Sequence, residues 1–400
     1  MKDFYKETEV ADILGISKRS LARFKNNLFT QPEGGKISYE LLKDLEPFKK
    51  MENSKWNKEY KTKPKKQFTL IELFAGAGGL AIGLHKSGFK SLLLNDFDKD
   101  SCETLKSNTN WNVVHDDVAN LDLSEHQNKV DVLSGGFPCQ AFSYAGKKRG
   151  FEDTRGTLFY EFAKRAVECK PKVILAENVR GLFNHDGGRT LETISNVIDE
   201  IGYDLVEPQI LKAIFYQVPQ KRERLFLVAT RKDLNLKNKF VYPDPYFEIM
   251  NMRDALKKGK LFDTDCPVSV GSNYPNHKKK ILELVPQGGY WKDLPDKYQR
   301  EYMGGSYHLG GGKTGMARRL SWDEPSLTLT CAPAQKQTER CHPDETRPLT
   351  VREYARIQTF PDGWEFKGSL SSQYRQIGNA VPVNLGHAIG RALVRLLNSV

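Results

Sequence analysis

The 400-residue sequence lacks the features that define several large classes of protein. Its apolar runs are strand-sized, as in Leu225–Ala229, and fall well below the ~18 residues that a membrane-spanning helix needs. Met1–Tyr5 contain no apolar signal core, so we expect neither secretion nor membrane insertion. No internal repeat is present, and 39% hydrophobic with 28% charged residues is typical of a folded, soluble chain.

Cysteine is scarce, and no two cysteines have the Cys-x-x-Cys spacing of a zinc site, so we expect no metal. Scattered thiols without a signal sequence indicate a reducing compartment, and we therefore expect a cytoplasmic protein. A chemically special cysteine must then be recognised from its neighbours. The six are Cys102, Cys139, Cys169, Cys266, Cys331 and Cys341.

Charge is present in excess, with a formal net value of +11. Residues 1–66 hold 16 basic and 10 acidic side chains, so more than half of the excess lies in the first sixth of the chain. A basic end suggests contact with a polyanion, and a solvated lysine-rich surface is the alternative.

Residues 1–48 have the pattern of a helix-turn-helix module. Thr8 can cap a helix over Glu9–Leu14, and Ser17 can cap a second helix over Lys18–Lys25. A short wing at Lys36–Tyr39 and a helix at Glu40–Leu45 would follow. The pattern resembles small winged helices of the MerR or excisionase kind, which implies that the second helix contacts DNA through Lys18, Arg19 and Arg23.

A helical hairpin with a solvated basic face is the other interpretation of residues 1–48. Residues 49–66 hold eight lysines against two glutamates, which predicts a flexible linker.

From Phe68 onward, apolar strand-like runs alternate with helical stretches. Because the strands are continuously apolar, the sheet should be covered on both faces, as in a doubly wound α/β domain at residues 67–242. The expected strands are Phe68–Phe74, Ser91–Asp96, Asn112–Val114, Val130–Leu133, Lys172–Ala176, Leu205–Leu211 and Arg224–Ala229. The expected helices include Leu80–Ser87, Leu158–Cys169 and Arg189–Ile201.

Residues 243–345 are rich in proline, glycine, lysine and aromatic residues without clear periodicity. Helical pattern returns in residues 346–400, over Thr350–Gln358 and Asn384–Leu397. We therefore expect an irregular insertion, followed by helices that complete the α/β domain.

A glycine-rich stretch between the first strand and the first helix predicts a ligand-binding turn. Glycines there allow a sharp turn and close approach to a ligand at the helix N-terminus. Asp96, at the end of the next strand, can bind ribose hydroxyls; Phe97 can lie on an adenine ring or pack in the core; Asp117 can accept from an exocyclic amine. NAD, FAD and S-adenosylmethionine would each fit. The stretch comprises Phe74, Ala75, Gly76, Gly78 and Gly79.

Three further stretches carry chemistry. Cys139 follows Phe137-Pro138 in a loop after a strand, where a thiol is placed for nucleophilic attack, although an isolated cysteine is more often buried. Glu177 lies at another strand end and can be held with a raised pKa. Arg222 and Arg224, two residues apart, should face the same side of a strand; a salt-bridge ladder with Glu223 is the alternative.

Taken in order, Phe-Ala-Gly-Ala-Gly-Gly, Gly-Phe-Pro-Cys-Gln, Glu-Asn-Val and Gln-Lys-Arg-Glu-Arg resemble the DNA (cytosine-5) methyltransferases. Arg-Pro-Leu-Thr-Val-Arg-Glu from Arg347 and Gln-Ile-Gly-Asn-Ala-Val-Pro from Gln376 resemble the closing motifs of that family. The resemblance covers about residues 68–240 and 346–396. It implies a Rossmann-like methyltransferase domain, with residues 243–345 as the target-recognition domain.

The resemblance implies that Cys139 attacks carbon 6 of a flipped-out cytosine, while Glu177 and Arg224 bind the ring and Arg222 supports the loop or a phosphate. This sequence departs from the family pattern at two positions: it has Asp96 where the family usually has glutamate, and Phe97 where tryptophan is common. The implied contacts to S-adenosylmethionine are Phe74, Ala75, Gly76, Gly78, Gly79, Asp96, Phe97, Asp117, Pro138, Asn379 and Ala380.

The implied partner is double-stranded DNA, bound by a monomer, with a cognate restriction endonuclease as a further expected partner. Base readout is expected from polar side chains of the recognition region. Three alternatives stay open: methylation of RNA, transcriptional regulation, including binding of residues 1–48 to the protein's own promoter, and an NAD oxidoreductase. The expected DNA contacts are Lys313, Arg318, Arg319, Gln335, Lys336, Gln337, Arg340 and His342.

Overall fold

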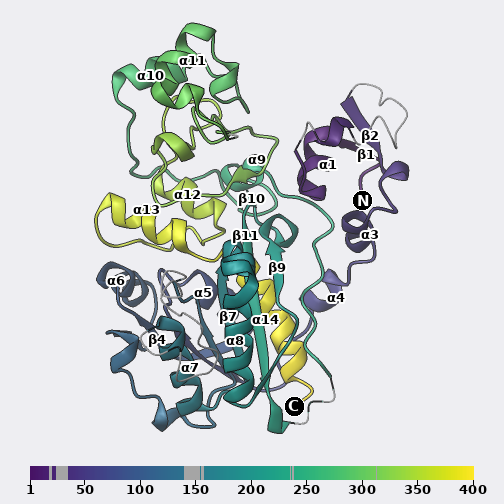
Figure 1. Ribbon diagram of the computed structural model, residues 1–400, viewed down its shortest axis with the longest axis vertical. Coiled ribbons are helices and arrows are strands. Elements are labelled where there is room, and N and C mark those ends of the chain that lie inside the picture. Colours follow the sequence, from purple (N-terminus) through teal and green to yellow (C-terminus); the bar gives the residue numbers. More distant parts are fainter. Residues whose placement is uncertain are drawn as a thin grey trace. The chain divides into compact units, whose positions relative to one another are not determined.

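The computed structural model describes residues 1–17, 20–23, 35–138, 154, 157–234, 236, 238–311 and 313–400 (Figure 1). The chain forms two compact units, each assembled from separate segments. The sheet unit comprises Lys61–Ala213, Glu223–Pro243 and Phe360–Val400. The insertion unit comprises Met1–Tyr60, Ile214–Arg222 and Asp244–Thr359.

The sheet unit contains a mostly parallel sheet of eight strands in the order β5-β4-β3-β6-β7-β11-β8, with β9 also paired to β11. Neighbouring strands from β5 to β7 run parallel, whereas β11 is antiparallel to β7, β8 and β9. The strands are β3 Phe68–Leu73, β4 Phe89–Asp96, β5 Val113–His115, β6 Val132–Gly135, β7 Val173–Val179, β8 Tyr203–Leu205, β9 Gln209–Lys212 and β11 Glu223–Arg231.

Helices cover both faces of this sheet, which confirms the α/β prediction. Side chains of α7 and α8 form one core with alternate residues of the strands, among them Ile71, Leu133 and Ile174. On the other face, α5 packs against β4 and α14. The helices of the unit are α5 Gly79–Lys86, α6 Lys99–Asn108, α7 Leu158–Cys169, α8 Arg189–Glu200, α13 Leu370–Asn379 and α14 Val383–Leu397.

Two helices far apart in sequence, α5 and α14, pack with their backbones almost in contact. A Cβ added to Gly83 would lie 2.5 Å from the backbone nitrogen of His387, and one added to Gly386 would lie 3.3 Å from the Cα of Leu80. The Ser87 hydroxyl crosses the same interface and donates to the carbonyl of His387 at 3.1 Å. Only glycine permits this approach, so the last helix is fixed to the first helix of the sheet unit.

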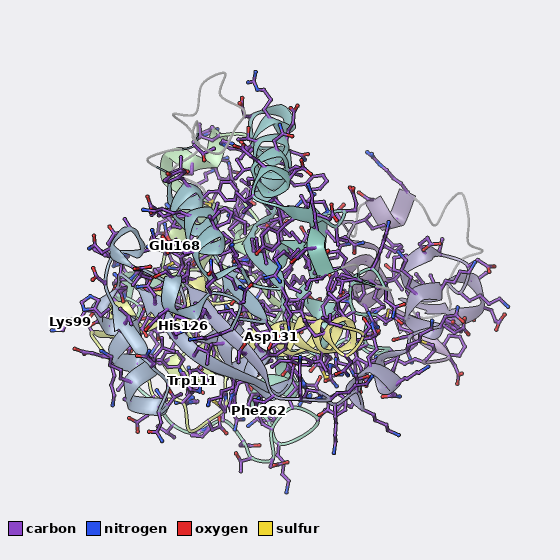
Figure 2. All side chains as sticks on the ribbon, turned by 90° about the horizontal axis from the view of Figure 1, so that it is seen from below. Lys99, Trp111, His126, Asp131, Glu168 and Phe262 are labelled. Atoms are coloured by element: carbon purple, nitrogen blue, oxygen red, sulfur yellow. The ribbon has the colours of Figure 1, made fainter. Side chains whose placement is uncertain are left out.

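At the amino ends of the central strands, one carboxylate joins three of them. Asp131, labelled in Figure 2, accepts from the backbone N–H of Thr69 at 2.8 Å and from Lys172 Nζ at 2.7 Å. This end of the sheet is thereby occupied by structural contacts, which leaves the carboxyl ends for ligands.

The insertion unit is irregular, as expected for residues 243–345, but it also contains short helices that the sequence pattern did not predict. Its two β-ladders are short: β1 pairs antiparallel with β2, and β10 pairs parallel with β12. Its elements are β1 Phe4–Lys6, α1 Glu7–Leu14, β2 Lys36–Ser38, α3 Glu46–Glu52, α4 Trp56–Tyr60, β10 Gln220–Lys221, α9 Met252–Leu256, α10 Asn276–Leu282, α11 Asp296–Met303, β12 Ser326–Leu327 and α12 Val351–Ile357.

The N-terminal residues differ in detail from the expected winged helix. Helix α1 begins at Glu7, with Lys6 rather than Thr8 in the N-cap position. The expected helix at Glu40–Leu45 is a short 3-10 turn at Tyr39–Leu41. Lys36–Ser38 is a strand, as expected of the wing. Residues 20–23 are helical, but Lys18 and Arg19 lie outside the described residues, so the DNA-binding assignment stays a prediction.

The expectation of a flexible linker at 49–66 is wrong for most of its length. Helices α3 and α4 reach Tyr60, and Met51 and Trp56 are buried. The lysines misled the prediction because they lie on the solvated faces of short helices that bury their few apolar side chains.

Within the sheet unit, sequence pattern missed α6 and α13. Both are polar helices, and each is bounded by a side-chain cap, Asp98 for α6 and Ser369 for α13. The expected single strand at Leu205–Leu211 is split into β8 and β9, which both pair with β11. In the described part of the chain, no helix is both long and apolar enough to cross a membrane.

We expect Gly83→Ala to destabilise the protein by on the order of 1–3 kcal/mol, because the new methyl group would push α14 away from α5. Unfolding by guanidinium measures the change. Gly363→Ala is the matched control, since no atom lies within 4 Å of the added Cβ there. Equal stability of the two variants would contradict this account of the helix packing.

Candidate active site at the carboxyl ends of the strands

The strand order reverses between β3 and β6, where one half of the sheet continues to β4 and the other to β7. Loops that follow two such strands diverge, and the crevice between them is where open α/β sheets bind ligands. The loop after β3 is the glycine-rich turn, and the loop after β6 leads to Cys139. The two principal candidate stretches are thus brought together at one edge.

The glycine-rich turn has a backbone that few residue types can adopt. Phe74, Gly76 and Gly78 have φ values of 56°, 53° and 84°, in the left-handed region. A Cβ at Gly78 would also lie 2.7 Å from the side chain of Leu105. The turn leads from the carboxyl end of β3 directly into the N-terminus of α5, as a cofactor loop requires.

Asp96 holds this turn in place. Its carboxylate accepts from the backbone N–H of Gly76 at 2.7 Å and from that of Asp98 at 2.8 Å. Burial raises the pKa of Asp96, while these two amide donors act in the opposite direction. Asp96 therefore joins the end of β4 to the glycine-rich turn, a contact that the sequence did not reveal.

Phe97 and Asp117 both lie at the surface of this edge. The Phe97 side chain is 74% exposed, so the alternative of core packing is wrong. Asp117 is half-buried and accepts from the backbone N–H of Ala119 at 2.9 Å. An exposed aromatic ring at the end of β4 and a half-buried carboxylate after β5 suit the adenine of a nucleoside cofactor.

The closing motif lies beside the glycine-rich turn. Asn379 ends α13 and is exposed, and Ala380 follows it. A Cβ on Gly79 would collide with the backbone oxygen of Val381 and would lie 3.2 Å from the Cβ of Ala380. The structure thus brings together the beginning and the end of the sheet unit at the candidate cofactor site.

The loop after β6 is held at its base by an amide. Asn178 Nδ2 donates to the carbonyl of Phe137 at 2.8 Å, and the Phe137 ring packs on Phe159. Pro138 is exposed. Cys139 itself lies outside the described residues, so its role stays a prediction.

Glu177 and Arg224 form an ion pair at the same edge. Arg224 Nε lies 2.7 Å from Glu177 Oε1, and both side chains are largely buried. A Cβ on Gly136 would lie 3.0 Å from Glu177 Oε2, so the glycine leaves room for this carboxylate beside the loop that leads to Cys139.

Arg222 and Arg224 do not belong to one strand, contrary to the expectation. Arg222 follows β10 in the insertion unit, is fully buried, and donates from Nη1 to the carbonyl of Leu329 at 3.3 Å. Arg224 lies in β11 of the sheet unit. The chain leaves one ladder after Lys221 and enters another at Glu223, so the single strand assumed for these two arginines is interrupted.

The family model for C-5 cytosine-specific DNA methylases matches residues 68–395. The chain belongs to this family. Type II methyltransferase M.Eco47II of Escherichia coli is 60% identical over 100% of this chain and 97% of its own length. Type II methyltransferase M.PspPI of Psychrobacter is 56% identical over 98% of this chain and 95% of its own length.

The fold agrees with that of solved structures. A crystal structure of Spodoptera frugiperda DNMT2 superposes with a TM-score of 0.58 and 16% identity, over 82% of this chain and 99% of that chain. The chain is therefore a DNA (cytosine-5) methyltransferase, and its methyl donor is S-adenosylmethionine.

In this methyltransferase, several residues expected to read DNA have structural roles instead. Arg319 and Arg340 are buried, and their guanidinium groups donate to backbone carbonyls, including those of Val285 and Thr328. His342 is also buried and accepts from the backbone N–H of Glu345. The expectation of base contacts is wrong for these three, because the described part of the insertion has only short ladders and satisfies some of its carbonyls with arginines.

The other expected DNA contacts differ in exposure. Gln335 and Gln337 are exposed, as is Arg23 in the N-terminal segment. Lys336 and Lys313 are half-buried and donate to backbone carbonyls of Met303 and Tyr307. Arg318 lies 3.8 Å from Glu324.

Sequence analysis missed Glu72, a buried carboxyl group on β3, directly before the glycine-rich turn. Ser134 of β6 donates to Glu72 Oε2 at 3.3 Å. Burial raises the pKa of Glu72 to about 8. The position of Glu72, as a single charged residue within an apolar strand, was the feature of the sequence that could have indicated a buried carboxyl group.

We expect the stability of the methyltransferase to fall from pH 5 to pH 8 because of Glu72. The raised pKa means that the folded state retains a proton that the unfolded chain releases near pH 4.5, so the stabilisation present at low pH is lost as the pH rises towards 8. In Glu72→Gln, the decrease in the free energy of unfolding between pH 5 and pH 8 should be smaller by on the order of a few kcal/mol. Urea unfolding across this range measures it, and parallel profiles for both proteins would contradict it.

We expect Phe97→Ala to weaken S-adenosylmethionine binding about tenfold, since stacking on a base is worth roughly 1–3 kcal/mol. Thermal stability should not change, because the ring is exposed. Calorimetric titration measures the affinity, with Phe97→Trp as the control that retains an aromatic face. Full affinity in the alanine variant would exclude a stacking role.

Proposed function

We propose that Cys139, Glu177 and Arg224 methylate carbon 5 of a cytosine turned out of double-stranded DNA, through a covalent adduct with Cys139. The observation that carries this proposal is the Glu177–Arg224 ion pair beside Gly136, in the loop that leads to Cys139. The carboxyl and guanidinium groups of this pair match the polar atoms of a pyrimidine, and the chain reaches the Cys139 thiol three residues after Gly136.

The chemistry explains why a thiol is needed. Carbon 5 of cytosine is a poor nucleophile. When the Cys139 thiolate forms a bond to carbon 6, the electrons of the 5,6 double bond move to carbon 5, which then bonds to the methyl group. Loss of the proton from carbon 5 restores the double bond and breaks the carbon–sulfur bond, which returns the thiolate.

Glu177 offsets the charge that develops when sulfur adds. A carboxyl group at ring nitrogen 3 stabilises the ring in that state, and burial makes the contact stronger than it would be in water. Arg224 fixes the orientation of Glu177 through its Nε and binds the carbonyl oxygen of the base. Arg222 acts one step away, because its contact with the Leu329 carbonyl supports the neighbouring loop.

The residues of the cofactor edge fit S-adenosylmethionine. Phe97 presents its exposed ring to the adenine, and Asp117 accepts a hydrogen bond from the exocyclic amine of that base. The turn at Phe74–Gly79 contacts the remaining part of S-adenosylmethionine. Ala75, Pro138, Asn379 and Ala380 complete the proposed contacts. When bound, S-adenosylmethionine supplies an electrophilic methyl group.

Base recognition is proposed for the exposed polar residues of the insertion, among them Gln335 and Gln337. Extrusion of the cytosine from the duplex costs a few kcal/mol, which contacts to the pocket and the DNA backbone offset. Similar proteins are named Type II methyltransferases, which supports DNA rather than RNA as substrate and a restriction endonuclease as functional partner.

We expect Cys139→Ser to lose methylation by several orders of magnitude while it retains most of its DNA affinity. Tritium transfer from labelled S-adenosylmethionine to genomic DNA measures activity, and total RNA serves as the competing substrate. DNA in which 5-fluorocytosine replaces cytosine should trap the wild-type protein, because fluorine cannot leave carbon 5 as a proton does.

Cys266→Ser is the matched control, since Cys266 is a partly exposed thiol of the insertion unit, whereas Glu177 and Arg224 belong to the sheet unit. Normal turnover by Cys139→Ser, or the absence of a trapped complex with the wild type, would overturn the covalent mechanism. Transfer to RNA alone would overturn the assignment of DNA as substrate.

A further inference from the structure

The N-terminal 60 residues lie outside the matched family region, yet they share a hydrophobic core with the insertion. Tyr5, Val10 and Ile13 pack in one cluster with Ile214 and Ile249. Because this core includes residues more than 200 positions away, the N-terminal segment is an integral part of the insertion unit.

Aromatic and backbone contacts extend the same interface beyond the N-terminal core. Trp56 of α4 packs edge-on against Tyr246, with ring centroids 5.3 Å apart. Next to it, the Ser54 hydroxyl donates to the carbonyl of Pro245 at 2.5 Å, and the backbone N–H of Lys55 donates to Asp244 at 2.8 Å. The segment first expected to be a linker is therefore fastened to the start of the insertion.

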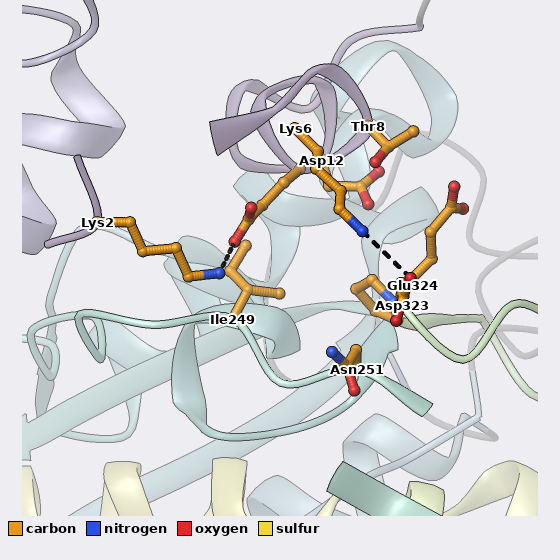
Figure 3. A pocket seen from close by; sticks show the side chains of 10 residues that line it. Lys2, Lys6, Thr8, Asp12, Ile249, Asn251, Asp323 and Glu324 are labelled. Atoms are coloured by element: carbon orange, nitrogen blue, oxygen red, sulfur yellow. Dashed lines mark hydrogen bonds and ion pairs between the residues drawn. The ribbon is translucent and has the colours of Figure 1, made fainter. Parts of the chain in front are cut away.

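Ion pairs connect α1 and its neighbours with the insertion. Figure 3 shows Lys6 reaching Asp323, with Nζ and Oδ2 3.1 Å apart, at the edge of a cavity of about 110 Å³. Asp12, which lines the same cavity, accepts from Lys221 Nζ at 2.7 Å. The side chains of Asp12 and Lys221 are only 11% and 26% exposed, so water screens this pair far less than an ordinary surface pair.

Lys221 lies within the Gln-Lys-Arg-Glu-Arg motif, where neighbouring side chains are held from other directions. Gln220 Oε1 accepts from the backbone N–H of Leu329 at 2.9 Å, and Arg222 donates to the carbonyl of Leu329. The hydroxyl of Thr328 donates to the carbonyl of Lys221 at 2.6 Å. Asp12 thus supplies a contact from the N-terminal segment to a strand that is otherwise held by the insertion.

We propose that Asp12 is a positioning residue for DNA methylation: through Lys221 it fixes the segment Gln220–Arg222 that leads into Arg224. The N-terminal segment then acts as a brace for this motif. The inference depends on the methyltransferase activity and on the proposed role of Arg224. It assigns residues 1–60 a part in modification itself, whether or not they also bind a promoter.

A purely structural ion pair would behave differently from a positioning pair. Loss of a structural pair lowers stability and leaves the kinetics of the folded protein unchanged. Loss of a positioning pair lowers kcat/KM for DNA in protein that is still folded. The affinity for S-adenosylmethionine should not change in either case, because the proposed cofactor contacts lie in the sheet unit.

The test is a double-mutant cycle in the full-length protein with Asp12→Asn, Lys221→Gln and the combined variant. We expect each single variant to lower kcat/KM for DNA roughly three- to tenfold, and the combined variant to be no worse than either, which is the non-additivity of a coupled pair. Asp12→Glu should restore part of the loss. KM for S-adenosylmethionine and the melting temperature are measured alongside.

Glu40→Gln is the matched control, since it removes an exposed ion pair with Lys43 from the same segment. Wild-type kinetics in Asp12→Asn, additive losses in the cycle, or a change confined to melting temperature would each overturn the proposal. Arg224→Gln in the same assay separates the two proposals. Full activity of that variant would refute the role of Arg224, and the cycle would still report the coupling of Asp12 with Lys221.

Discussion

Close backbone contact between α5 and α14 is the constraint on which the candidate active site depends. The two helices are separated by almost 300 residues, and the insertion unit occupies much of the sequence between them. Glycines at the interface allow the last helix to return to the first, which places Ala380 and Val381 against Gly79. Without that approach, Ala380 and Val381 would not contact the glycine-rich turn at Gly79.

A cluster of carboxyl groups gives this edge an electrostatic character opposite to that of the whole chain. The protein has a net charge of +11, yet Glu72, Asp96 and Glu177 lie in the carboxyl-terminal halves of three strands of the sheet, β3, β4 and β7. Each has a different partner: Ser134 for Glu72, backbone amides for Asp96 and Arg224 for Glu177. Such variety lets similar side chains serve as a buried acid, a loop anchor and a substrate contact.

Much of the sheet unit could be predicted from the sequence, because buried parallel strands are continuous apolar runs and α7 is a strongly amphipathic helix. The ordered motifs also indicated that Glu177 and the glycine-rich turn lie at the carboxyl ends of the strands. Helices α6 and α13 were missed because most of their residues are polar, and side-chain caps and contacts such as that between Thr104 and Gln376 help to hold them. The roles of Arg222, Arg319 and Arg340 could not be predicted, since residue type alone does not distinguish an arginine that binds phosphate from one that binds a carbonyl.

The chain passes between the two units at five points, after Tyr60, Ala213, Arg222, Pro243 and Thr359. If the insertion reads the DNA sequence, as proposed above, this interleaving bears on how new specificities could be engineered by exchange between relatives. Transplanting residues 244–359 alone would separate them from the N-terminal core and from the short segment at 214–222 with which they fold. A functional graft must carry all three segments, so the unit of exchange in this enzyme is discontinuous in the gene although it is continuous in space.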